Sequence, residues 1–143
     1  MNTYKNLEIY QLAFNLSIKI YRLNMTLPKH IFLKQGNRLR WSSVKIKDII
    51  IESCSEGNNE NDFIRFLNIA GTLCNEIILQ LKKINTGQYG KKSIHELIIN
   101  YRTLKKKMEN NIENIEKRQD ELVIPFPAKE GEKRKMEQNN IYK

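Results

Sequence analysis

Glycine, proline, cysteine and histidine are all scarce in this chain of 143 residues, which has 6 Gly, 3 Pro, 2 Cys and 2 His. The shortage of Gly and Pro argues against a turn-rich β protein and favours long helices. Two cysteines cannot build a disulfide framework. With only two His and three Asp, the chain has little material for a metal cluster or an acid–base site. We therefore expect an all-α protein that is not an enzyme and has no cofactor and no metal site.

Long apolar runs are missing as well. No run approaches the roughly 18 residues that a membrane-spanning helix needs. The opening MNTYKNLEIYQ carries charge where a signal peptide would be apolar. We therefore expect a cytoplasmic protein that does not contact membranes. Apolar residues still form 40% of the chain, which is enough for one core.

Hydrophobic periodicity predicts four helices joined by short connections, which is typical of an up–down–up–down four-helix bundle. The expected helices cover residues 5–24, 36–55, 60–84 and 93–121. Pro28 breaks the helical pattern, so residues 25–35 are expected to form a connection. The bundle is expected to occupy residues 1–124, and the charged, aperiodic residues 125–143 are expected to be a disordered tail.

Local signals mark several helix ends. Asn58 or Asn59 can cap the third helix, and Thr86-Gly87 can end it. Ser93 and Glu96 have the spacing of a capping box for the fourth helix.

The first helix has two apolar stripes, whereas a helix in a monomeric bundle needs one. One stripe contains Leu7, Tyr10, Phe14, Ser17, Ile18 and Tyr21, and the opposite stripe contains Ile9, Leu12, Ala13, Leu16, Ile20 and Leu23. We therefore predict an oligomer. Its expected subunit-interface residues are Ile9, Leu12, Leu16, Ile20, Leu23 and Trp41. A central helix in a larger monomer is the alternative, but 143 residues leave little chain to cover it.

Charge alternates in sign along this basic chain, whose net charge is +9. The segments with their net charges are residues 19–40 (+6), 48–62 (−5), 82–92 (+4) and 109–121 (−3). In an up–down–up–down bundle both basic segments lie at one end and the acidic segments at the other. Subunits associated in parallel would join their basic ends into a ring suited to a phosphate backbone.

These basic residues are the best functional candidates, and we predict that they bind RNA or DNA through phosphates. They are Lys19, Arg22, Lys34, Arg38, Arg40, Lys82, Lys83, Lys91 and Lys92. The alternative is a solvated helix end whose charge only aids solubility. Lys105-Lys106-Lys107 is a second candidate, and Trp41 or Tyr89 could stack on bases.

The cysteines, histidines and two helical glutamates are expected to have structural roles rather than roles in catalysis or metal binding. Cys74 is expected in the core, about 21 Å along the bundle from Cys54, so a disulfide is excluded. Glu52 and Glu76 are interpreted as surface or interface groups rather than an acid–base pair. His30 and His95 have no ligand cluster around them in the sequence.

An ordered set of motifs resembles the four-helix-bundle proteins encoded by intervening sequences in 23S rRNA genes. The matching pieces are YKNLEIYQLA at residues 4–13, Leu27-Pro28-Lys29 with Gly36, Leu39-Arg40 with Ser42, Ser43 and Ile46, Phe63-Ile64-Arg65-Phe66-Leu67 with Ala70, Cys74, Glu76 and Leu81, and Thr86-Gly87. The accessory variability protein of diversity-generating retroelements is similar in fold. The chain departs from the family pattern at Trp41, where a second Arg is usual, and at residues 49–53, where Asn-Ile-x-Glu-Gly is usual.

The resemblance implies a closed helical bundle, commonly assembled as a ring-shaped homopentamer, with no known catalytic activity. It also implies a basic surface that contacts nucleic acid. In the retroelement members, the ring is an accessory to a reverse transcriptase. A protein-interaction scaffold with incidental charge is the alternative function.

Overall fold

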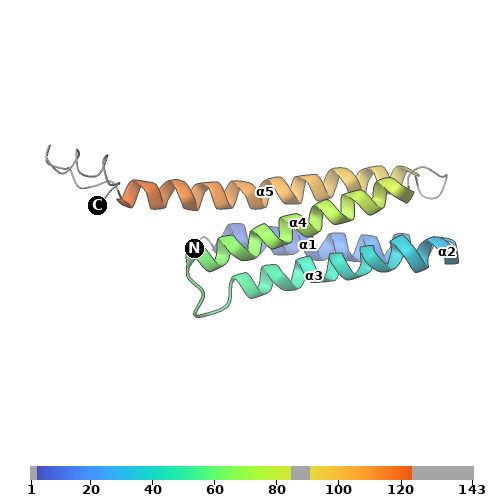
Figure 1. Ribbon diagram of the computed structural model, residues 1–143, viewed down its shortest axis with the longest axis horizontal. Helices are drawn as coiled ribbons and strands as arrows, with labels where there is room; N and C mark the ends of the chain where they lie inside the picture. Colours follow the sequence, from blue (N-terminus) through green and yellow to red (C-terminus); the bar gives the residue numbers. More distant parts are fainter. Residues whose placement is uncertain (1–2, 85–90, 124–143) are drawn as a thin grey trace, which may run out of the picture. The chain divides into compact units, whose positions relative to one another are not determined.

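The computed structural model describes residues 3–84 and 91–123, and every regular element in them is helical. The elements are α1 (Thr3–Asn24), α2 (Lys29–Ile31), the π-helical turn η1 (Phe32–Gly36), α3 (Asn37–Ser53), α4 (Glu60–Ile84) and α5 (Lys91–Val123) (Figure 1). The chain divides into two compact units, Met1–Ile112 and Glu113–Lys143. None of the described helices is long and apolar enough to cross a lipid bilayer.

Within Met1–Ile112, successive long helices run in opposite directions (Figure 1). Helix α1 packs on α3, and α3 packs on α4. The first turns of α5 lie beside the end of α1. The predicted all-α, up–down–up–down arrangement is therefore confirmed for one chain. The predicted domain boundary after residue 124, the tail at 125–143, the Thr86-Gly87 stop and Tyr89 lie outside the described residues.

The core uses one apolar stripe from each long helix. Its largest fully buried side chains include Tyr101, Phe63, Ile9, Leu16, Ile20, Leu39, Ile46, Leu67, Ile77, Leu81 and Ile94. Burying a side chain of this size contributes about 1.5–3 kcal/mol. Cys74 is in the core as predicted, and Ser42 and Ser43 are buried where α3 meets its neighbours.

The orientation of α1 corrects the predicted subunit interface. The stripe that was expected to face another subunit packs inside the chain's own bundle, because Ile9, Leu16, Ile20 and Leu23 are all at most 5% exposed. Leu12 is half-buried. On the opposite stripe Leu7, Phe14 and Tyr21 are 42–60% exposed. The aliphatic stripe fills the core because branched chains pack closely without leaving a polar group unpaired, whereas the other stripe carries two tyrosines.

The second helical stretch starts earlier than predicted, at Lys29 rather than residue 36. Pro28 precedes it with φ −59° and ψ 152°, and the Pro28 carbonyl accepts a hydrogen bond from the Phe32 N–H at 2.9 Å. Proline suits this position because the first turn of a helix has no partner for its N–H groups. The connection between α1 and α2 is therefore only Met25–Pro28.

Gly36 ends the π turn at a place where the backbone comes close to α1. The Asn24 side-chain amide donates to the Gly36 carbonyl at 2.9 Å. A Cβ at Gly36 would lie 3.1 Å from Cδ1 of Phe32 and 3.2 Å from Oδ1 of Asn24. A side chain here would therefore require Phe32 or Asn24 to shift by a few tenths of an ångström, whereas the backbone is ordinary right-handed helix with φ −60°.

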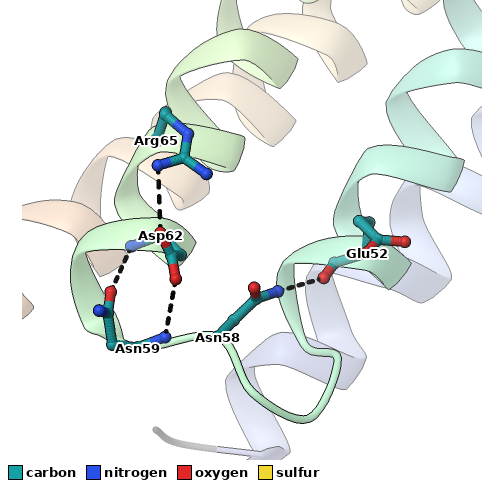
Figure 2. Close-up of polar contacts among 5 residues, drawn as sticks. All are labelled: Glu52, Asn58, Asn59, Asp62 and Arg65. Atoms are coloured by element: carbon teal, nitrogen blue, oxygen red, sulfur yellow. Dashed lines mark hydrogen bonds and ion pairs between the residues drawn. The ribbon is translucent and has the colours of Figure 1, made fainter.

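A reciprocal capping box starts α4 (Figure 2). The Asn59 side-chain oxygen accepts from the Asp62 N–H at 2.8 Å, and the Asp62 carboxylate accepts from the Asn59 N–H at 3.1 Å. Arg65 also binds the Asp62 carboxylate, at 3.1 Å. Asn58 has a different role, since its amide donates to the Glu52 carbonyl at 2.7 Å. Of the two predicted caps, Asn59 is the one that is used.

The start of α5 differs slightly from the prediction. The helix begins at Lys91, so Ser93 lies within its first turn instead of capping it. Ser93 is exposed and lines a groove between α1 and α5.

Candidate nucleic-acid interface

The predicted cations all belong to the described residues, and all are exposed. Lys19, Arg22, Lys34, Arg38, Arg40, Lys82, Lys83, Lys91 and Lys92 come from the last turns of α1 and α4, from η1, and from the first turns of α3 and α5. Because neighbouring helices are antiparallel, these segments meet at one end of the Met1–Ile112 unit (Figure 1). We call this set the basic end.

Lys29 also lies at the basic end and is exposed, although it was not among the predicted binding residues. A proline directly before a basic residue is the signal that could have placed it, since proline is favoured at the start of a helix.

Arg38 forms an ion pair across the helices of the bundle. Its guanidinium lies 3.6 Å from the Glu76 carboxylate on α4. The buried Gln80 side chain donates to the same carboxylate oxygen at 2.8 Å. An exposed pair of this kind contributes about 0–1 kcal/mol to stability. Glu76 offsets part of the Arg38 charge, so Arg38 is a weaker phosphate ligand than its exposed neighbours.

A groove of about 560 Å³ opens between the end of α1 and the start of α5. Lys19 and Arg22 of α1 lie on one side, Glu96 and Asn100 of α5 on the other, and Leu23 and Leu97 are also part of its lining. Within the part of the chain that the structure describes, neither Lys19 nor Arg22 forms an ion pair. Their charges are therefore available to an anion.

Asn24 holds the basic end together from inside. It is 6% exposed, and its amide reaches from the end of α1 to the last residue of η1. Its side-chain oxygen is buried without a hydrogen-bond partner. The contact fixes η1 against α1 and so positions the exposed Lys34 within that turn.

The second candidate, Lys105-Lys106-Lys107, is largely committed to internal contacts. Lys105 pairs with Glu109 at 3.3 Å, and Lys107 pairs with Glu8 of α1 at 3.2 Å. Lys106 is exposed. This triplet therefore offers less free charge than the basic end.

The buried titratable groups are unsuited to chemistry at neutral pH. Burial raises the pKa of the Cys74 thiol to about 12, although nearby Lys105 opposes this. Burial also raises the pKa of Tyr101, whose hydroxyl has no hydrogen-bond partner. Both groups stay protonated, so neither supplies a nucleophile or a base.

The other chemically interesting residues are not brought together. Cys54 is exposed and unpaired with the buried Cys74. Glu52 lies in the last turn of α3, whereas Glu76 lies about 24 Å along α4 from its first residue at 1.5 Å per residue. Among the described residues, no cluster of three or more His, Cys, Asp or Glu side chains could hold a metal ion.

Several exposed large apolar side chains lie on α1 and α3, and others lie on α4 and α5. Those on α1 and α3 are Leu7, Phe14, Tyr21, Trp41, Val44 and Ile51, and we call them the α1/α3 apolar face. Trp41, which was predicted at a subunit interface, is 60% exposed in the single chain. Tyr10 stacks on Phe14 with ring centroids 6.1 Å apart, and the Lys47 ammonium lies 5.9 Å from the Phe14 ring. The α1 stripe therefore borders α3 on the outside of the bundle.

Comparison with known proteins identifies the family. No curated protein and no solved structure gives a significant match to this chain. A family model described as "23S rRNA-intervening sequence protein" matches residues 5–111, which include α3 and α4, nearly all of α1 and the first two thirds of α5. Apart from Tyr4, the matched range contains the motifs noted in the sequence, and it contains every residue of the basic end. The chain belongs to the 23S rRNA-intervening sequence protein family.

Proposed function

We propose that this protein is a non-catalytic accessory protein that binds nucleic acid through the phosphates with its basic end. The supporting observation is the gathering of exposed cations from several helix termini, most of them without a carboxylate partner among the described residues. Lysine and arginine at helix ends neutralise phosphates without reading bases. A larger enzyme or RNA complex would use such a surface to hold its template.

Binding of a labelled structured RNA and a labelled DNA duplex, measured by fluorescence anisotropy from about 50 to 200 mM salt, tests this proposal. We expect submicromolar affinity at low salt and a steep negative slope of log K against log salt. Absence of binding at the lowest salt by a folded protein would overturn the proposal.

Charge reversal gives the matched comparison. Reversing Arg40, Lys82, Lys91 and Lys92 to glutamate should flatten the salt slope, because about four fewer phosphates are neutralised. Reversing Lys45, Arg102, Lys106 and Lys117 makes the same change in net charge at exposed positions outside the basic end. We expect this control to keep most of the slope. Equal losses in the two variants would mean that net charge alone drives binding.

We further propose that copies associate side by side through the α1/α3 apolar face, as the ring-shaped homopentamers implied by the sequence resemblance do. Exposed Phe14 and Trp41 support this, because large apolar side chains left in contact with water can gain stability in a protein interface. Parallel association would bring the basic ends of several copies onto one rim, which multiplies the phosphate contacts. This assembly places the interface on the stripe of α1 opposite to the one predicted from the sequence.

Sedimentation velocity tests the assembly. Phe14→Glu with Trp41→Glu should shift the protein to monomers, because each charge would be buried unpaired in the interface. Leu79→Glu on α4 is a matched control, since Leu79 is 48% exposed and lies outside the face. An oligomer that survives the double substitution, or a wild-type monomer, would contradict this interface.

A reverse transcriptase is the partner we propose for the accessory role, by resemblance to the retroelement members. Neighbouring genes discriminate this case: a reverse-transcriptase gene beside this one favours it, whereas an rRNA operon favours the intervening-sequence lineage. The second candidate function is a protein-interaction scaffold without direct nucleic-acid binding. The apolar face on α1 and α3 favours this alternative, since it offers a docking surface that needs no charge.

A further inference from the structure

We propose that the groove between α1 and α5 binds one nucleotide of a single-stranded nucleic acid and favours a base with an exocyclic amino group. This inference rests on the proposed nucleic-acid binding and adds a site and a preference to it. Of the residues that line the groove, three come from α1, four come from α5, and Thr26 comes from the connection after α1.

The size of the groove suits a nucleotide. Its volume of about 560 Å³ is within the range of about 300–1,000 Å³ that is usual for small-ligand sites. Leu23 and Leu97 belong to its lining and are at most 5% exposed, so they close the groove on its inner side. A simple electrostatic surface has no need of such a hollow, since phosphates are contacted on convex surfaces as well.

The α1 side of the groove fits a phosphate. Lys19 and Arg22 are exposed, line the groove, and form no ion pair among the described residues. Glu96 lines the same groove without pairing with either of them. The two cations are thus free to bind a phosphate at the rim, where Arg22 can contact two oxygens at once.

The α5 side fits a base edge better than a second phosphate. Glu96 is a carboxylate, so it repels phosphate and can accept a hydrogen bond from a ligand. An amino group of cytosine or adenine is such a donor, and carboxylates pair with the cytosine N4 amino group in known recognition. The Asn100 amide, about one helical turn from Glu96, offers both a donor and an acceptor. Uracil has no amino group to offer.

The amino groups on these base edges are accessible in a single strand, whereas in a duplex they form Watson–Crick hydrogen bonds. Sequence-selective RNA recognition accordingly targets unpaired bases. The basic end alone would bind duplex and single strand alike, so a preference for the single strand distinguishes the groove from the rest of the surface.

The test measures binding of short oligo(rC), oligo(rU) and oligo(dC) and of an RNA duplex to the full chain at one salt concentration. Wild-type protein should bind oligo(rC) about tenfold more tightly than oligo(rU), as expected for one discriminating contact to a base. Glu96→Gln should bring the two affinities close together, because a neutral amide no longer favours the amino donor. Comparing the affinities for oligo(rC) and oligo(dC) shows whether the groove prefers single-stranded RNA or single-stranded DNA.

Glu113→Gln is the control for the loss of charge in Glu96→Gln. Asn110→Trp is the control for the added bulk in a second test variant, Ser93→Trp. Glu113→Gln removes the same charge from an exposed position beyond the Met1–Ile112 unit and should keep the cytosine preference. Ser93→Trp fills the groove from its exposed rim without changing charge, and should weaken single-strand binding while leaving duplex binding unchanged. Asn110→Trp, also exposed on α5, should change neither.

Equal affinity for oligo(rC) and oligo(rU) in the wild type, or unchanged single-strand binding by Ser93→Trp, would overturn the inference. If reversal of the basic end still abolished duplex binding in that case, the proposed function would stand without the groove. If no nucleic acid bound the wild-type protein at low salt, the proposed function and the inference would both fail.

Discussion

The two ends of the bundle carry opposite charge, and their charged side chains differ in whether they form contacts within the fold. At the acidic end, the Asp62 carboxylate accepts from the Asn59 N–H and from Arg65, and so takes part in folding the turn before α4. At the basic end, Lys19, Arg22 and Arg40 form no ion pair among the described residues. Charge that is engaged in local structure stabilises the fold, whereas unpaired charge of one sign repels itself and gains only from a partner.

Glycine at position 36 and glycine at position 57 are favoured for different reasons. Replacing either one should give the largest change in the free energy of unfolding among these predictions. Gly36 needs space, since a Cβ would approach Phe32 and Asn24 within 3.1–3.2 Å. Gly57 has open space but φ +94°. Gly36→Val should lower the free energy of unfolding by about 1–3 kcal/mol through overpacking. Gly57→Val should also destabilise the protein, but by backbone strain.

Asparagine separates the two causes, because it tolerates a left-handed backbone better than other residues do. In urea denaturation, Gly57→Asn should recover much of the stability that Gly57→Val loses, whereas Gly36→Asn should remain destabilised. If asparagine recovered the same stability at both positions, Gly36 and Gly57 could not be distinguished as limited by space and by backbone conformation.

High pH should weaken the core that separates the two ends. The pKa of Cys74 is raised by burial from its ordinary 9.0 to about 12, so above pH 9 the unfolded chain binds fewer protons than the folded one. The free energy of unfolding therefore falls as pH rises from about 9 to about 12, with Tyr101 acting in the same direction. Cys74→Ala should make this fall shallower in urea denaturation across the pH series. Cys54→Ala, at an exposed thiol, should leave it unchanged.

Removing the cap at the acidic end should have an effect of intermediate size. Asn59→Ala leaves the Asp62 N–H without its acceptor and should cost about 1 kcal/mol of stability. Nucleic-acid affinity should not change, since Asn59 is at the opposite end from the cations. Loss of affinity in a fully folded Asn59→Ala variant would contradict the separation of roles between the ends.

The smallest expected effect compares two arginines within the basic end. Arg38 shares its charge with Glu76, whereas Arg40 has no ion pair among the described residues. Arg40→Ala should weaken binding to an RNA duplex more than Arg38→Ala does, while Arg38→Ala should lower stability by no more than about 1 kcal/mol. Glu76→Gln should strengthen binding slightly by releasing Arg38. The reverse order of the two arginines would show that the ion pair opens on binding.

Much of the fold could be predicted from the sequence because its apolar spacing is regular. The helix expected at residues 60–84 is α4, Glu60–Ile84, and the Asn59 cap was among the predicted ones. The start at Lys29 was not predicted, because proline both ends and begins helices and Pro28 was interpreted as a break. The gathering of the cations followed from antiparallel topology alone.

The orientation of α1 was not determined by its sequence pattern, because both stripes are apolar and a period does not say which one faces the core. The chemical contrast between aliphatic Ile9, Leu16 and Ile20 and aromatic Tyr10, Phe14 and Tyr21 is the signal that could have decided it. The groove between α1 and α5 needed three-dimensional information, since Arg22 and Glu96 are far apart in the sequence.

The π turn has a consequence for how the basic end is arranged around its circumference. The Asn37 N–H bonds to the Phe32 carbonyl, five residues back, so η1 holds one residue more than an α-helical turn. One extra residue advances the helical phase by about 100°. Lys29 is therefore rotated away from the side that it would take in a continuous helix with α3. A polyanion that contacts Lys29 would therefore approach the basic end from a different side than a continuous helix would allow.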